Sequence, residues 1–189
     1  MNQCLNEFDL ISNCIKFNEC LMSEPQSDNL TLKESFGRAD FINKTALILS
    51  SWFGIGLIPR MPGTVGTLAA IPVCIIMNRL GLFLGGIFLA IFIALAVWSS
   101  GVTERLLGRD DPSEVVIDEV VGFMLTIYLL PISWLSIALG FMMFRFFDIL
   151  KPFPIKKLER IGGGTGIVLD DLVAGIYAGL SIKIFFIFL

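Results

Sequence analysis

Two pairs of adjacent acidic residues interrupt apolar stretches of this sequence. Asp118 and Glu119 stand in "VVIDEVVGF", and Asp170 and Asp171 stand in "GIVLDDLVAG". Ionisable side chains inside apolar helices are rare and mark functional sites. Carboxylates brought together repel one another unless they are protonated or bridged by a cation, and a ligand set of oxygens alone suits Mg²⁺. The sequence therefore predicts that these four side chains bind Mg²⁺.

A glycine follows each acidic pair at a helical spacing. Asp118 and Gly122 are four residues apart, as are Asp171 and Gly175, so each glycine shares a helix face with an acid. Small residues let helix backbones approach closely. We therefore expect each acidic pair to lie at a tight helix–helix contact.

A stripe of basic residues accompanies the acids. Arg145, Asp148 and Lys151 follow one another at intervals of three residues, close to one stripe of a helix. Arginine is a bidentate phosphate ligand and lysine adds a point charge, so this stripe predicts a phosphate-binding site. The alternative is structural: the bases reach lipid headgroups, or the acids merely pair with these bases or cap helices.

Two glycine-rich stretches, "PGTVGT" (62–67) and "GGGTG" (162–166), each precede a predicted helix. Backbone N–H groups at such a helix start can form an anion nest. Together with the charged stretches they indicate a phosphorylated substrate. The sequence contains no histidine, which excludes phosphohistidine chemistry and a histidine base. Metal-assisted attack by water, or an aspartate nucleophile, are the mechanisms that stay open.

The composition is typical of a membrane protein. Hydrophobic residues make up 55% of the 189 residues and charged residues 16%, with a mean hydropathy of +0.80; soluble domains have about 25% charged residues. The net charge of −3 indicates no surface for nucleic acid. The four cysteines form no C-x-x-C pair, so we expect free thiols in a reducing compartment.

Apolar runs predict the helices that hold the charged residues. Residues 80–103 carry no charge and are long enough to cross a bilayer, and residues 172–189 are apolar except for Lys183. Shorter runs cover 65–78 and 46–59, the second of which is expected to be a half-helix or an interfacial segment.

The charge-free stretch 120–144 allows two interpretations. It is either one long span or a hairpin of two helices, 113–130 and 133–150, in which Pro131 ends the first helix and Ser133 caps the second. Only the hairpin gathers most basic loop residues on one membrane face, which the positive-inside rule assigns to the cytoplasm. We therefore expect the hairpin.

These elements together predict an all-α fold. We expect a polytopic membrane helical bundle of four to five transmembrane helices with short or re-entrant segments. Residues 1–40 are expected to form a polar N-terminal cytosolic extension, and residues 41–189 the membrane-embedded domain.

The motifs agree in order and spacing with those of a known family. Over residues 54–179 the chain resembles the phosphatidylglycerophosphatase A family of bacterial membrane phosphatases, through "PGTVGTLAAIP", "VIDEVVGF", "FRFFDILKPFPI" and "GGGTGIVLDDLVAG". The resemblance implies Mg²⁺-dependent hydrolysis of phosphatidylglycerophosphate, a membrane phospholipid, to phosphatidylglycerol and inorganic phosphate. It also implies a multi-pass protein of the bacterial cytoplasmic (inner) membrane, with its active site facing the cytoplasm and residues 41–189 as the phosphatase domain.

The resemblance, joined to the residue analysis, assigns roles to the site residues. Thr64 and Thr67 occupy hydroxyl positions of the first motif. The predicted catalytic residues are Asp118, Glu119, Asp148, Asp170 and Asp171, of which Asp118, Glu119, Asp170 and Asp171 are the predicted metal ligands; the predicted phosphate-binding residues are Arg145, Lys151, Arg60, Gly63 and Thr64.

Two other functions are weighed against this one. A CDP-alcohol phosphatidyltransferase would require a D-G-x-x-A-R pattern, whereas Asp170 and Asp171 are followed by "LVAG". A small cation or proton transporter would use buried acids near the middle of the membrane, whereas these acids are expected at one edge. The sequence leaves open the oligomeric state, including a homo-oligomer, the number of Mg²⁺ ions, the attacking group and the lipid selectivity.

Overall fold

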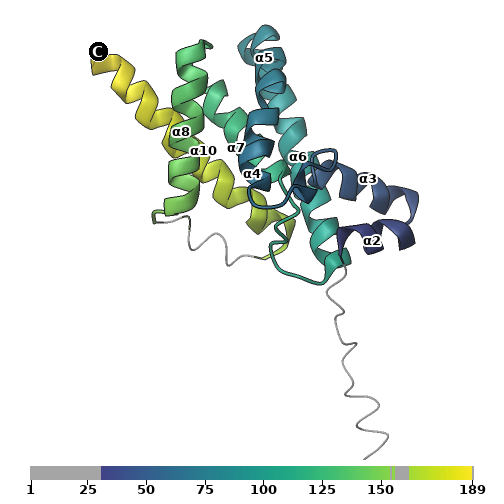
Figure 1. Cartoon of the computed structure of the whole chain (residues 1–189). Helices are drawn as coiled ribbons and strands as arrows, with labels where there is room; N and C mark the ends of the chain where they lie inside the picture. Colours follow the sequence, from purple (N-terminus) through teal and green to yellow (C-terminus); the bar gives the residue numbers. More distant parts are fainter. Residues whose placement is uncertain (1–30, 154, 156–161, 189) are drawn as a thin grey trace, which may run out of the picture.

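The computed structural model describes residues 31–153, 155 and 162–188, and all regular structure in these ranges is helical (Figure 1). This confirms the predicted all-α class for the described residues. Most of the predicted N-terminal extension lies outside them, as do Cys4, Cys14 and Cys20. The helices are α2 (Leu32–Arg38), α3 (Phe41–Ser50), the 3₁₀ turn η1 (Ile55–Leu57), α4 (Pro62–Ala69), α5 (Ile71–Arg79), α6 (Gly81–Leu107), α7 (Ile117–Tyr128), α8 (Trp134–Leu150) and α10 (Gly163–Phe188).

Two helices are long and apolar enough to cross a membrane. α6 has 27 residues and α10 has 26, and at about 1.5 Å per residue each exceeds the roughly 30 Å of a bilayer core. Most side chains in their apolar stretches face outward, as Phe83 and Phe188 do, rather than into a protein core. α7 has 12 residues and α8 has 17, so the expected four to five spans stay a prediction.

The predicted hairpin is present in place of one long span. α7 ends before Pro131, and Ser133 caps α8 by accepting a hydrogen bond from the Ser136 N–H at 3.0 Å. The expected start of the first arm near Ser113 is wrong. The chain reaches α7 through a non-helical segment in which the Val116 N–H donates to the Ser50 carbonyl at 2.8 Å.

This late start changes the position of the first acidic pair. Asp118 and Glu119 lie in the first turn of α7, not one to two turns inside a helix as the earlier start implied. Negative side chains at a helix N-terminus are favoured by the helix dipole. The acids therefore stand where α7 begins, at the end of the loop that follows α6.

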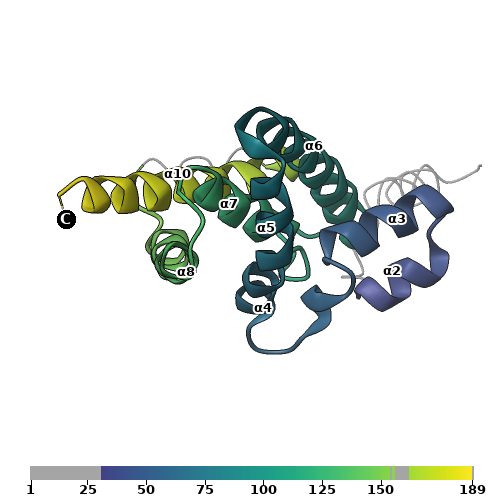
Figure 2. The same cartoon turned by 90° about the horizontal axis from the view of Figure 1, so that it is seen from above.

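The shorter apolar runs form a layer of small helices beside the long ones (Figure 2). The run 65–78 is divided between α4 and α5, with Pro72 at the start of α5. The run 46–59 forms the end of α3 and then η1, in agreement with the expected half-helix. In the view of Figure 2, α2 and α3 lie on one side of the bundle, and α8 with the C-terminal part of α10 on the other.

A close backbone contact joins α7 to α10. An added Cβ at Gly175 would overlap the Gly122 carbonyl oxygen, and one at Gly122 would lie 2.7 Å from the Asp171 carbonyl oxygen. The buried Thr126 hydroxyl bridges the crossing, with the Gly122 carbonyl at 3.1 Å and the Gly175 carbonyl at 3.2 Å. The tight contact that the glycine spacing predicts is therefore confirmed, and it brings the two acidic pairs together.

The variant Gly175→Ala tests this crossing. The added methyl group forces α7 and α10 apart, which we expect to destabilise the protein by about 1–3 kcal/mol and to lower its midpoint of thermal unfolding in detergent. The control is Gly37→Ala on α2, where an added Cβ meets nothing within 4 Å. Equal midpoints for both variants would show that the crossing tolerates a side chain.

Candidate functional site

A polar cavity of about 400 Å³ collects residues from all four motifs. It is bounded by the start of α4, the loop between α6 and α7, the first turn of α7, the C-terminal end of α8 and the first third of α10. All ten predicted site residues line it: Arg60, Gly63, Thr64, Asp118, Glu119, Arg145, Asp148, Lys151, Asp170 and Asp171. The fold thus brings together residues that are as much as 111 positions apart in the sequence.

Ion pairs hold three of the acids. Arg145 Nη1 lies 2.7 Å from Glu119 Oε2 and 2.8 Å from Asp148 Oδ2, so one guanidinium joins α7 to α8. Lys151 Nζ lies 3.0 Å from Asp170 Oδ2 and joins the end of α8 to α10. The pairing that the structural alternative expects is therefore present for Glu119, Asp148 and Asp170. The side chains in these pairs are 10–23% exposed, so solvent still reaches them.

The Glu119 carboxylate packs against Thr67 and Gly63 of α4. The buried Thr67 hydroxyl shares its proton between Glu119 Oε2 at 3.2 Å and the Gly63 carbonyl at 2.9 Å. A Cβ at Gly63 would overlap the Glu119 carboxylate. The set of predicted site residues omits Thr67. The signal for it was its position four residues after Gly63, on the same face of α4.

Asp118 and Asp171 are the two acids without a basic partner. Both are buried, with exposed fractions of 8% and 4%, and neither forms an ion pair among the described residues. Asp118 Oδ1 is buried and has no hydrogen-bond partner. Burial raises the pKa of Asp118 well above its usual range, and the negative charge of Glu119 raises it further. Asp118 therefore needs either a proton or a cation.

The charge of the cavity also calls for a cation. Among the described residues, six carboxylates and three basic side chains line it, because Asp111 from the loop before α7 joins the predicted acids. Within the described part of the chain, no three acidic side chains are close enough to form a ready-made metal site. The donor chemistry nevertheless fits Mg²⁺: the oxygens of Asp118 and Asp171 are not neutralised by a base, and hard cations take oxygen ligands.

The two glycine-rich stretches differ in what they do. Gly63 and Thr64, at the start of α4, line the cavity, where the first N–H groups of a helix lack helical partners. At the start of α10, the Gly163 N–H instead donates to Glu104 Oε1 at 3.2 Å, and a Cβ at Gly164 would overlap the α6 backbone at Gly101. The second stretch therefore serves capping and helix packing, and its expected role as an anion nest is not supported.

The amino-acid sequence of this chain matches those of known proteins. The family model described as Phosphatidylglycerophosphatase A matches residues 48–186. The chain is 39% identical over 131 residues to the phosphatidylglycerophosphatase A of Escherichia coli (strain K12), covering 68% of this chain and 76% of that protein. It is 41% identical over 134 residues to the phosphatidylglycerophosphatase A of Haemophilus influenzae, covering 69% and 82%.

A third relative bears a different name. A Bacteroides thetaiotaomicron protein with the provisional name phosphatidylinositol-3-phosphatase is 33% identical over 147 residues, covering 73% of this chain and 91% of that protein. No solved structure is significantly similar to the chain.

The variant Arg145→Met tests the electrostatic role of this arginine. Without it, Glu119 and Asp148 lose their shared cation, which we expect to cost about 1–3 kcal/mol of stability at neutral pH. Burial raises the pKa of Glu119, so its carboxyl takes up a proton as the pH falls, and the loss should shrink in acid. The control is Arg105→Met, since the Arg105 side chain donates to the Gly101 carbonyl at an exposed position. A loss for Arg145→Met that does not vary with pH would contradict the ion-pair interpretation.

Proposed function

This chain belongs to the phosphatidylglycerophosphatase A family and is a phosphoric monoester hydrolase, and from this premise we propose that it hydrolyses phosphatidylglycerophosphate to phosphatidylglycerol and inorganic phosphate with Mg²⁺ as cofactor. The observation that carries the proposal is the single cavity in which all ten predicted residues meet. The reaction would belong to glycerophospholipid biosynthesis.

The basic side chains and the start of α4 would bind the phosphate. Arg145 and Lys151 offer N–H donors from α8, and Arg60 lines the cavity from the turn before α4. The free N–H groups of Gly63 and Thr64 would face the same anion. For Arg145 and Lys151 to bind phosphate, the phosphate oxygens must share or replace the carboxylates that these bases now contact.

Asp118 and Asp171 would hold Mg²⁺ most directly, because no base in the described part of the chain pairs with either of them. Glu119 and Asp170 would join them once phosphate binding loosens their ion pairs. A bound divalent cation neutralises phosphoryl oxygens and lowers the pKa of a coordinated water. Asp148 lies 2.8 Å from Arg145, where it would serve as a further ligand or as the base that accepts a proton from the attacking water.

The membrane position follows from the long helices. With α6 and α10 in a bilayer, the cavity lies near one end of both helices, since α6 ends just before the loop that lines the cavity. The lipid would stay anchored at the membrane while its phosphate reaches the cavity. Following the positive-inside rule, we place this end at the cytoplasmic face of the bacterial inner membrane.

The decisive experiment measures phosphate release by the purified protein, with and without Mg²⁺. The substrates are phosphatidylglycerophosphate, phosphatidate and, because of the third relative, phosphatidylinositol 3-phosphate. We expect Mg²⁺-dependent release that is fastest from phosphatidylglycerophosphate. Release of CMP from a CDP-alcohol donor would favour the transferase, and ion flux in liposomes without hydrolysis would favour the transporter.

The variants Asp118→Asn and Asp171→Asn test the metal ligands. Each keeps the shape of the side chain but removes its negative charge, so we expect phosphate release to fall by at least about 100-fold while the unfolding midpoint stays at or above that of the wild type. The matched control is Asp110→Asn, an exposed acid of the loop between α6 and α7 that does not line the cavity. Full activity in either cavity variant would remove that residue from the site.

The raised pKa of Asp118 predicts a pH-dependent need for the metal. Below its raised pKa the carboxyl keeps its proton and cannot bind a cation, so a metal ion must compete with the proton. We expect the Mg²⁺ concentration for half-maximal activity to rise as the pH falls. Titrations of Mg²⁺ across a pH series measure this dependence, and a constant requirement from neutral into acidic pH would refute it.

A further inference from the structure

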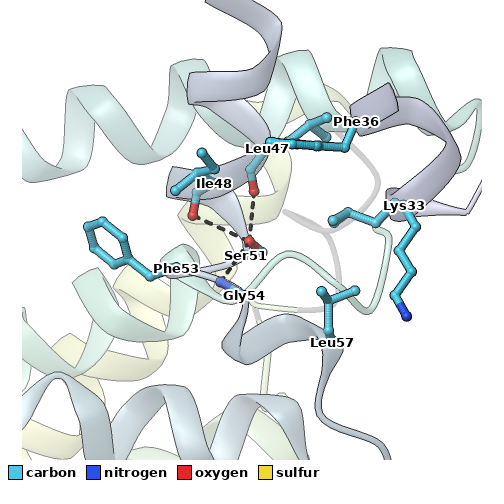
Figure 3. A pocket seen from close by; sticks show the side chains of 9 residues that line it. Lys33, Phe36, Leu47, Ile48, Ser51, Phe53, Gly54 and Leu57 are labelled. Atoms are coloured by element: carbon cyan, nitrogen blue, oxygen red, sulfur yellow. Dashed lines mark hydrogen bonds between the residues drawn. The ribbon is translucent and has the colours of Figure 1, made fainter. Parts of the chain in front are cut away.

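A second cavity, of about 450 Å³, lies between α2, α3 and the turn that leads to η1 (Figure 3). We call it the α2–α3 pocket. Its apolar walls are formed mainly by Leu32, Phe36, Leu47, Ile48, Phe53 and Leu57. Its volume is within the range of about 300–1,000 Å³ that is typical of ligand sites. The hydrolytic function described above does not use it.

The polar groups inside this pocket are already satisfied. The Ser51 hydroxyl donates to the Leu47 carbonyl at 2.7 Å and accepts the Gly54 N–H at 3.2 Å (Figure 3). The Lys33 side chain extends away from Phe36 and Leu47 (Figure 3). The pocket thus offers its occupant apolar contact and little else, which suits a hydrocarbon chain.

The pocket lies at the same end of α6 as the catalytic cavity. Leu32 and Leu47 pack with Leu107, the last residue of α6, and the following loop runs into the cavity. Leu57 lines the pocket and Arg60 lines the cavity. Three residues of chain can separate the Cα atoms of Leu57 and Arg60 by at most about 11 Å. The α2–α3 pocket and the catalytic cavity therefore lie close together.

The surface around the pocket has the character of a membrane-interface element. Phe41 is 85% exposed, Ile42 66% and Phe53 72%. Lys33 lies at the rim, and Lys44 Nζ lies 5.7 Å from the centre of the Phe36 ring. Exposed apolar side chains beside lysines are typical of segments that lie in the headgroup region of an anionic bilayer. The lysines complement the charge of an anionic phospholipid.

The turn that forms one wall is strained. Trp52, Phe53 and Gly54 have successive φ angles of 48°, 57° and 89°, in the left-handed region that bulky residues avoid. The turn is held by hydrogen bonds from the Phe53 N–H to Ile48 and from the Gly56 N–H to Ser51, at 2.8 and 2.9 Å. Holding this turn in a left-handed conformation lowers the stability of the folded state, and the surrounding contacts must offset that loss.

We propose that the α2–α3 pocket binds one acyl chain of the phosphatidylglycerophosphate substrate while the phosphate end lies in the catalytic cavity. The inference rests on the proposed function and adds where the lipid tail is held. The α2 wall lies outside residues 48–186, the part that the family model matches. The pocket is therefore completed by a segment that the family match does not include.

The test compares two substrates on the full chain in mixed detergent micelles. One is long-chain phosphatidylglycerophosphate, and the other is its deacylated, water-soluble headgroup. The double variant Ile48→Trp/Leu57→Trp fills the pocket. We expect its KM for the diacyl lipid to rise about tenfold, since losing the burial of about two methylene groups is sufficient. Its kcat/KM for the deacylated substrate should equal that of the wild type.

The control is Ile42→Trp, which makes one such substitution at an exposed position of α3 outside the pocket. Should the double variant fail to fold, Leu57→Trp alone repeats the test at a position that is 44% exposed. An unchanged KM for the diacyl lipid, or an equal loss on both substrates, would overturn the inference. If the wild type hydrolysed neither substrate, that result would instead overturn the proposed function.

Discussion

The crossing of α7 over α10 is the constraint on which the rest of the structure depends. Gly122 and Gly175 bring the two backbones into direct contact, and each lies four residues after an acid of its own helix. The contact therefore determines how near Asp118 and Asp171 must be. Side chains of ordinary size at the crossing would separate the helices and, with them, the two acidic pairs. Packing and electrostatics are thus coupled, because the close packing of α7 against α10 brings the two acidic pairs together.

The ion pairs around the crossing relieve only part of this repulsion. Arg145, in the C-terminal half of α8, and Lys151, directly after its last residue, reach Glu119 and Asp170 on the two crossing helices. Within the ranges that the structure describes, Asp118 and Asp171 have no basic partner. An anionic phosphate monoester would be repelled from such a cavity unless protons or a cation offset the remaining carboxylates. The unbalanced charge is therefore consistent with a hydrolase that binds its anionic substrate together with a metal ion.

Local chemistry explains what the sequence could predict. Pro131 and Ser133 indicate the turn between α7 and α8 because proline ends a helix and serine caps one, whatever lies further away. The spacing between each acid and its glycine predicts the helix crossing, because it depends only on residues within one helix. The start of α7 depends on a hydrogen bond from Val116 to the distant Ser50, which no local pattern contains.

Long-range partners explain what the sequence could not predict. The hydrogen bond from Thr67 to Glu119 joins residues 52 positions apart. The hydrogen bond by which Glu104 caps α10 joins residues 59 positions apart. Which acids are paired and which are left alone is likewise decided by tertiary contacts. The motifs identify the residues that meet in the cavity, whereas their individual roles and the number of membrane spans stay predictions.

The cap on α10 also bears on how the chain is assembled. Glu104 holds the first turn of α10 against α6, Gly164 packs on Gly101, and the crossing with α7 fixes the next turns. These contacts anchor α10 to α6 and α7 through residues of the helices themselves. A chain divided between α8 and α10 would therefore yield two fragments that keep these contact surfaces, so the native arrangement could be rebuilt by association of the separate pieces in a membrane.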